Sequence, residues 1–181
     1  MHNITSKIVI IVRDETKEKK IVESKGNTII RNFLTIYEQI FKFALSGEAS
    51  KFTDIYGKVH AMDSGLYVDC KVQPLMALGE GDKPVSFDDY NLAKPITKWD
   101  RVEKCEVIYD NTKFKITCKA YKPYRFDRDT TIFEAGLAWH IFDDIGDPHP
   151  TMVDRIVLDT PITVSANRTI DVYYILEIGK S

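Results

Sequence analysis

The sequence predicts a mainly β protein: a jelly-roll-like antiparallel β-sandwich with one amphipathic α-helix, folded as one domain over residues 1–181. Residues 130–178 divide into three strand-like runs, whereas only residues 27–46 carry a convincing helical period. In the last run, Asp171 and Glu177 are charged and every even position is apolar, which is typical of a strand with one face in a core. These even positions are Ile170, Val172, Tyr174, Leu176 and Ile178. With 181 residues, 44% of them hydrophobic, the chain is long enough for one well-buried core.

The first elements are expected to be a hairpin and the helix. Strands at Lys7–Asp14 and Lys20–Glu23 flank a charged run, which indicates a solvated turn. Asn27 offers an N-cap oxygen to a helix that ends at Ser46, directly before a glycine. We expect the hairpin and helix, residues 7–46, to pack on the strands of residues 52–178.

The apolar stripe of this helix is wider than one packed face requires. Tyr37 and Phe41 lie in the part that widens it. One side of the stripe should pack on a sheet, and the other side stays open between a loop and a neighbouring subunit. Tyr37 and Phe41 are therefore candidate interface residues.

The middle of the chain predicts short strands and one long loop. Lys58–Met62 and Leu66–Val72 are joined by a turn that contains Gly65, and Pro74–Leu78 is a further apolar run. The segment Pro84–Ile96 has two prolines and no clean period, so we expect an ordered loop with one helical turn near residues 87–92. No internal repeat is visible.

The strongest hairpin signal joins Arg101–Tyr109 to Lys113–Ala120. Apolar and polar residues alternate along the second strand, and Asp110 and Asn111 tolerate the left-handed conformations of a tight turn. This turn pairs Val107 with Phe114 and Cys105 with Ile116.

Near the start of that hairpin, a bulge at Glu103 and Lys104 is expected to turn Val102 toward the core. The three cysteines, Cys70, Cys105 and Cys118, form no C-x-x-C pair and are interpreted as small buried hydrophobic residues.

Composition excludes several classes of protein. The net charge of -2 argues against a nucleic-acid binder, which usually carries a basic excess. No apolar run approaches the roughly 18–20 residues that span a bilayer. The run Ile8–Val12 is shorter than the roughly 7–15 residues of a signal-peptide core, so we expect synthesis and initial use in a cytoplasm.

Candidate chemistry is weak. Gly79–Asp82 is glycine-rich but lacks the pattern of a phosphate-binding loop, and no G-x-S-x-G elbow occurs. We therefore expect no enzyme, no catalytic or cofactor-binding residue and no assigned metal ligand. Whether the loop Asp143–Asp154 binds a cation stays open, since it contains possible oxygen and nitrogen ligands. These are Asp143, Asp144, Asp147, His149 and Asp154.

Aromatic residues offer an alternative function, a ligand-binding β-sandwich that recognises a glycan. Rings and cations alternate over residues 121–126, and flat exposed rings can stack on sugars. The candidate contacts are Tyr121, Tyr124, Phe126 and Trp139.

The order of short motifs resembles accessory virion structural proteins of tailed bacteriophages and archaeal viruses. The motifs are Leu78-Gly-Glu-Gly-Asp82, Ser86-Phe-Asp-Asp-Tyr-Asn-Leu92, the hairpin within residues 101–120, Phe133-Glu-Ala-Gly-Leu137 and the run Asp154–Val164. The resemblance implies an architectural protein of the virion, made in the host cytoplasm, and carries over no catalytic residue. It implies a homo-oligomer that bridges neighbouring capsid, vertex, connector or tail components.

Two further features are candidates for such assembly. The first strand, Lys7–Asp14, is expected at a sheet edge, where its backbone groups would be open to a neighbour. Tyr173 and Ile175 form an apolar pair on the otherwise polar face of the last strand. In a central strand, such a pair would mark a subunit contact.

Overall fold

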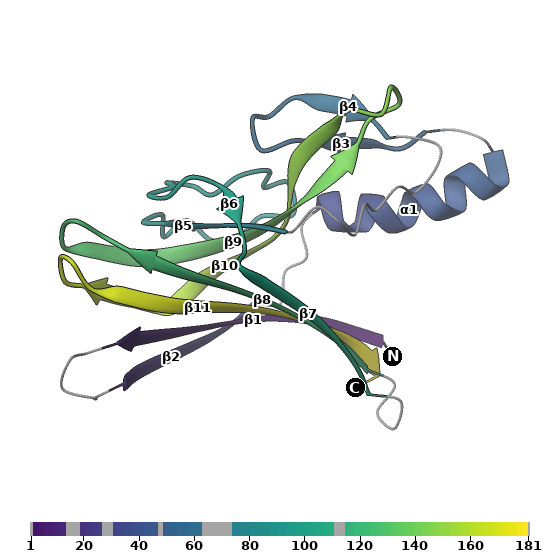
Figure 1. The fold of residues 1–181 in the computed structure, drawn as a ribbon. Coiled ribbons are helices and arrows are strands. Elements are labelled where there is room, and N and C mark those ends of the chain that lie inside the picture. Colours follow the sequence, from purple (N-terminus) through teal and green to yellow (C-terminus); the bar gives the residue numbers. More distant parts are fainter. Residues whose placement is uncertain are drawn as a thin grey trace.

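Two antiparallel sheets face each other in the computed structural model, which describes residues 2–13, 19–26, 31–46, 49–62, 74–110 and 115–180 (Figure 1). The five-stranded sheet has the order β2 (Lys19–Gly26), β1 (His2–Arg13), β11 (Thr169–Lys180), β8 (Lys115–Arg125) and β7 (Lys104–Asp110). The four-stranded sheet has the order β10 (Pro148–Val164), β9 (Thr130–Phe142), β5 (Leu75–Gly79) and β6 (Asp100–Arg101). The remaining elements are the pair β3 (Lys51–Thr53) and β4 (Val59–Ala61) and the helix α1 (Arg31–Ser46).

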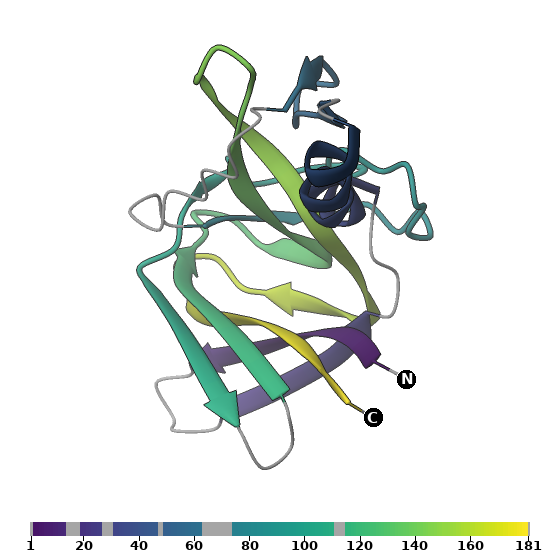
Figure 2. The same cartoon turned by 90° about the vertical axis from the view of Figure 1, so that its right-hand side faces the viewer.

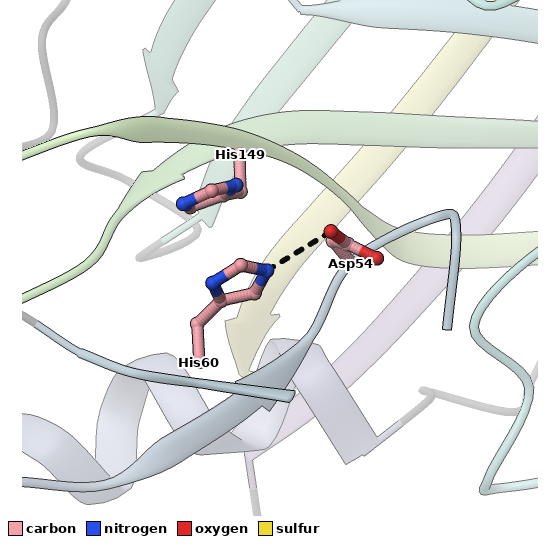
Figure 3. A group of neighbouring side chains, drawn as sticks. All are labelled: Asp54, His60 and His149. Carbon is pink, nitrogen blue, oxygen red and sulfur yellow. Dashed lines mark hydrogen bonds and ion pairs between the residues drawn. The ribbon is translucent and has the colours of Figure 1, made fainter. Parts of the chain in front are cut away.

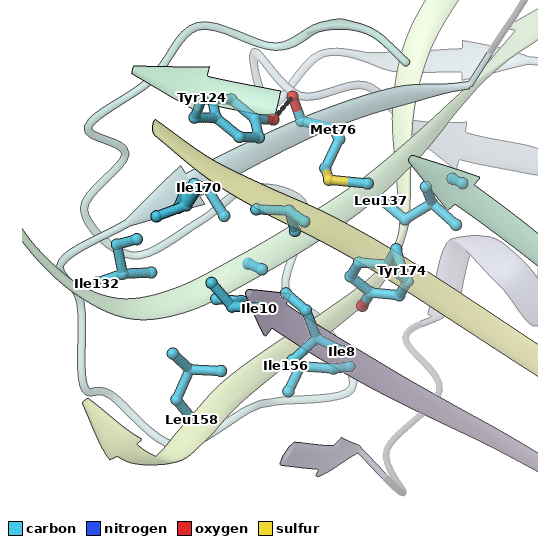
Figure 4. Packing of buried hydrophobic residues seen from close by; sticks show 14 of the residues in the cluster. Ile8, Ile10, Met76, Tyr124, Ile132, Leu137, Ile156, Leu158, Ile170 and Tyr174 are labelled. Carbon is cyan, nitrogen blue, oxygen red and sulfur yellow. Dashed lines mark hydrogen bonds between the residues drawn. The ribbon is translucent and has the colours of Figure 1, made fainter. Parts of the chain in front are cut away.

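The main core lies between the two sheets (Figure 4). Its five-stranded side includes Ile8, Ile10 and Tyr174, and its four-stranded side includes Ile132 and Ile156. The alternation predicted for the last strand is confirmed from Ile170 to Leu176, because Ile170, Val172, Tyr174 and Leu176 are all buried, while the side chain of Ile178 lies outside the described part of the structure. Full burial of an aliphatic side chain of this size contributes about 1.5–3 kcal/mol, so this strand anchors the fold.

The mainly antiparallel-β prediction is confirmed, whereas a jelly-roll arrangement is not. The expectation that the first strand is an edge strand is wrong. β1 pairs with β2 on one side and with β11 on the other, so its backbone groups are used on both sides.

The predicted register of the second hairpin is also wrong. Val107 faces Cys118 and Cys105 faces Ala120, and the pairing ends at Asp110 and Lys115. The shift is four residues along the second strand, so each side chain keeps its predicted face. Long pairing with β11 holds β8 in place, so the short-turn rule did not decide this register.

The chain passes from one sheet to the other at Val102. β6 pairs with β5 in the four-stranded sheet, while β7 pairs with β8 in the five-stranded sheet. Val102 is buried between them and donates its backbone N–H to Pro74 O at 2.9 Å. On the other side of the molecule β10 contacts β2. Val102 therefore reaches the core at this crossing between the two sheets.

The helix lies against β3 and β10. Asn32 donates its side-chain amide to Thr53 O at 2.8 Å and to Met152 O at 3.2 Å. The helix ends at Ser46 as predicted, while its predicted start at residues 27–30 and the predicted strand Leu66–Val72 lie outside the described residues. In the described part of the chain, no helix has the length and apolar character to cross a membrane.

The segment Pro84–Ile96 is an ordered loop, but the expected helical turn near residues 87–92 is not formed. A single turn occurs instead, in which Asp89 donates its N–H to Ser86 O at 3.1 Å. Hydrogen bonds with side chains of the four-stranded sheet hold this loop in place without a helix.

Candidate assembly surface

The strand β7 lies at the outer edge of the five-stranded sheet (Figure 2). Among the described strands it pairs with β8 alone, so backbone groups on its other side face outward. Residues 104–109 are all exposed, although Val107, Ile108 and Tyr109 are apolar or aromatic. A long exposed edge of this kind is a template for pairing with another strand.

The apolar face of this sheet continues beyond the part that the second sheet covers. Leu176, Cys118 and Val107 lie opposite one another across three neighbouring strands, and Tyr109 lies beside Ile116. Exposure rises toward the edge: 3% for Leu176, 47% for Val107 and 68% for Tyr109. Cys105 shares this face and is exposed, so the expectation that every cysteine is buried is wrong for it.

The predicted pair Tyr173 and Ile175 lies on the outer face of the same sheet. β11 is a central strand, and both side chains are half-buried. The Tyr173 ring lies 5.0 Å from the Tyr121 ring, and Val9 lies opposite Tyr173 on β1. The strand alternation therefore places Tyr173 beside Tyr121 and Val9 on this face and Ile175 between Lys7 and Lys119, and the role of the pair in a subunit contact stays a prediction.

The two helix candidates stay untested. α1 includes Tyr37 and Phe41, but their side chains lie outside the described part of the structure. Of the described apolar residues on this helix, Phe33 is buried and Leu34 is exposed. The first packs beside Trp139, with ring centroids 5.8 Å apart.

The expected exposure of the glycan-contact rings is wrong for Tyr124 and Phe126, which belong to the main core. Tyr124 donates its hydroxyl to Met76 O at 3.0 Å, and burial raises the pKa of its phenol. Trp139 is half-buried against the helix, and Tyr121 donates its hydroxyl to Asp171 Oδ1 at 2.9 Å. Tyr124 and Phe126 pack inward because they occupy core-facing positions of β8 and of the segment that follows it.

Four of the five motifs that carry the resemblance, all except the hairpin within residues 101–120, meet around one buried carboxylate, Glu134 of the run Phe133–Leu137. Its Oε1 accepts the N–H of Lys94 at 2.8 Å and that of Gly81 at 3.2 Å. Its Oε2 accepts the N–H of Ala93 at 3.0 Å and Nε of Arg155 at 2.7 Å. One side chain from β9 thus holds both ends of the loop at residues 81–94.

Arg155 completes this network from β10. Its guanidinium donates to Asp89 Oδ2 at 2.7 Å and to Lys83 O at 2.8 Å. Asp89 Oδ2 also accepts the N–H of Ser86 at 2.8 Å. A Cβ atom at Gly81 would lie 2.6 Å from Glu134 Oε1, which explains the glycine. These motif residues hold a loop on the sheet.

The candidate cation ligands of the loop Asp143–Asp154 do not come together as one group. Asp154 lies in the core, where Tyr174 donates its hydroxyl to Asp154 Oδ2 at 2.8 Å. Burial raises the pKa of the Asp154 carboxyl to about 6. Asp144 and Asp147 are exposed, whereas Asp143 is buried and accepts Nε2 of His149 at 2.9 Å.

Asp54 and His60 are the residues that sequence reasoning missed. His60 Nε2 lies 3.0 Å from Asp54 Oδ2, and the His60 and His149 rings stack with centroids 3.6 Å apart (Figure 3). The signal was a repeat: Asp54–His60 and Asp143–His149 both have the pattern Asp-x-x-Gly-x-x-His. This short repeat is visible in the sequence, so the expectation of no internal repeat is wrong.

The chain matches no family model, no curated protein and no solved structure.

Proposed function

We propose that this chain is a structural protein of a virus particle, which assembles with copies of itself and bridges neighbouring capsid, vertex, connector or tail components. The observation that carries the proposal is the exposed, apolar edge strand β7. The order of the sequence motifs supports it, because their residues hold a loop on a sheet and thus serve the architecture. The half-buried pair Tyr173 and Ile175 offers a second contact surface.

The sequence of β7 is complementary to itself when two copies run antiparallel. A pairing centred on Val107 places Lys104 opposite Asp110 of the second copy, and does so twice because the pairing is symmetric. Opposite charges across a strand pair stabilise it by roughly 0.2–1 kcal/mol each. Two-fold symmetry keeps the apolar faces together, so the pairing must be centred on a residue and the register can shift only by two residues at a time.

Neighbouring registers are disfavoured by charge. Centring the pair on Glu106 opposes that carboxylate to itself, and centring it on Ile108 opposes Glu106 to Asp110 of the second copy. Like charges directly opposite each other destabilise a strand pair. The charges of β7 therefore select the register that pairs all of its residues, with Val107 of one copy beside Val107 of the other.

Disulfide trapping tests this register. The variant Val107→Cys is made in a background in which Cys70, Cys105 and Cys118 are replaced by alanine. Opposed residues of an antiparallel pair have Cα atoms about 4.5–5.5 Å apart, within reach of a disulfide. We expect mild oxidation to give a covalent dimer. Ile108→Cys is the matched control, since that residue faces Glu106 of the second copy and should stay monomeric. Equal crosslinking of both variants, or of neither, would contradict the register.

Charge reversal tests the assembly without cysteine chemistry. Lys104→Asp should weaken self-association in analytical ultracentrifugation, and the double variant Lys104→Asp/Asp110→Lys should restore it. The virion role is tested separately by mass spectrometry of purified particles, which should contain this chain in a fixed ratio to the other components. A protein that stays monomeric at high concentration and is absent from particles would overturn the proposed function.

A further inference from the structure

We propose that the two Asp-x-x-Gly-x-x-His hairpins form a binding site for a divalent transition-metal ion such as Zn²⁺, with His60, His149 and Asp54 as ligands. Asp54, His60 and His149 each offer one ligand atom, and these atoms lie within 4.8 Å of one another. Two imidazoles and a carboxylate suit zinc, whose tetrahedral ligands lie about 3.4 Å apart. The site is independent of self-assembly through β7.

The two hairpins have the same local structure. Asp54 Oδ1 accepts the N–H groups of Tyr56 and Lys58, both at 2.9 Å. Asp143 Oδ1 accepts the N–H groups of Ile145 at 3.2 Å and Asp147 at 2.8 Å. In each turn the backbone therefore occupies Oδ1 and leaves Oδ2 directed at a histidine.

A left-handed glycine makes each turn possible. Gly57 has φ 82° and Gly146 has φ 87°, and each donates its N–H to the carbonyl of its aspartate at 3.0 Å. Since glycine adopts positive φ at no steric penalty, the chain can return and bring the histidine back beside the aspartate. The spacing of the pattern is thus explained by the turn that it builds.

The charges of the site favour a divalent cation. Hydrogen bonds from His149 and from the turn lower the pKa of Asp143. Burial acts to raise the pKa of Asp54, but hydrogen bonds from His60 and the turn outweigh it and lower the pKa. Both carboxyl groups are buried, and a divalent ion would balance the charge of the carboxylates.

The hydrogen bonds also prepare the ligand atoms. An ionised carboxylate only accepts, so Nε2 of His149 donates to Asp143 and the neutral ring keeps its lone pair on Nδ1. A carboxylate behind a ligating imidazole orients the ring in many metal sites. When an ion binds Nε2 of His60, the proton of that ring moves to Nδ1, which lies 4.0 Å from Asp143 Oδ2.

Binding requires one movement. The two rings are stacked with an interplanar angle of 24°, so both lone pairs cannot point at one ion until a ring turns. His149 is the freer ring, with 21% of its side chain exposed against 5% for His60. The bound ion would replace this ring stack and tie the β3–β4 hairpin to the end of the β9–β10 hairpin.

Calorimetric titration of the tag-free protein with Zn²⁺ tests the site. We expect saturable binding of one ion per chain, a higher thermal midpoint with Zn²⁺ than with EDTA, and no comparable effect of Mg²⁺. Co²⁺ in place of Zn²⁺ should give the visible absorption bands of a tetrahedral site. The variants His149→Gln and Asp54→Asn should each lose binding by at least tenfold.

The matched control removes the two histidines outside the pattern. His2→Gln/His140→Gln should bind Zn²⁺ as the wild type does, whereas His60→Gln/His149→Gln should not bind it. Because a variant in the buried pair could fail to fold, each is first checked by its thermal midpoint in EDTA. If His60→Gln unfolds, Zn²⁺ binding by His149→Gln, which changes the more exposed histidine, still tests the site. Absence of saturable binding by the folded wild type, or binding that survives in folded His149→Gln, would overturn the site.

Discussion

Arg155 and Glu134 form an ion pair inside the protein, with Nε of the arginine 2.7 Å from Oε2 of the glutamate and both side chains buried. The pair joins β10 to β9, and its remaining hydrogen bonds hold the loop at residues 81–94. Removing one member of such a pair leaves an uncompensated buried charge, which lowers the free energy of unfolding.

Arg155→Met should therefore destabilise the protein by about 3–5 kcal/mol. The double variant Glu134→Gln/Arg155→Met removes both charges, so it should lose less than Arg155→Met alone. Denaturant unfolding of the wild type, both single variants and the double variant gives the coupling free energy. A double variant that loses the full sum of the two single losses would contradict a coupled pair.

The Asp154 carboxyl should make stability depend on pH. Burial raises its pKa from 3.8 to about 6, so the folded chain binds more protons than the unfolded chain between these values. The free energy of unfolding contributed by this group is then largest below about pH 4 and falls as pH rises through about 6. The full loss is about 3 kcal/mol.

Asp154→Asn isolates this effect, since an amide oxygen can still accept the Tyr174 hydroxyl. We expect the variant to match the wild type near pH 4 and to be more stable than it near pH 8. Denaturant unfolding at several pH values checks this. The quantity to follow is the difference in unfolding free energy between variant and wild type at each pH. This difference cancels the contribution of Asp54 and Asp143, whose lowered pKa values make the protein less stable as pH falls. A constant difference at every pH would contradict the prediction.

The two faces of β11 should respond differently to charge. Val172 is fully buried between the sheets, so Val172→Asp should abolish folding. Ile175 lies on the outer face and is half-buried, so Ile175→Asp should leave a folded protein that self-associates less. Circular dichroism separates folding from association, which is followed by sedimentation. If both variants fail to fold, the outer face is also core and its assembly role is wrong.

The glycine of the second hairpin can be tested without a steric clash. A Cβ atom added at Gly146 would have no neighbour within 4 Å, so Gly146→Ala should lose about 1–2 kcal/mol through its positive φ alone. Gly146→Asn should lose less, because asparagine tolerates this conformation. Gly57→Ala should lose more than Gly146→Ala, since its Cβ would also approach the Tyr90 ring at 3.2 Å. Unfolding free energies that are equal for alanine and asparagine at residue 146 would contradict a backbone origin.

Parts of the candidate surface follow from local sequence pattern. Alternation along residues 169–178 placed Tyr173 and Ile175 opposite the core-facing residues, and the structure has them on an open face. The edge position of β7 was not predictable in this way. Strand order depends on which distant segments pair, and β1, which was expected at a sheet edge, lies between β2 and β11.

Sequence alone determined the strand period, the end of the helix at Ser46 and the side chains that face the core, because these depend on neighbouring residues along the chain. The tertiary structure decided how distant segments meet. Glu134 on β9 forms an ion pair with Arg155 on the neighbouring strand β10, and His60 stacks on His149 from a different hairpin. Such contacts arise from the packing of whole sheets, where burial of many side chains together outweighs any local preference.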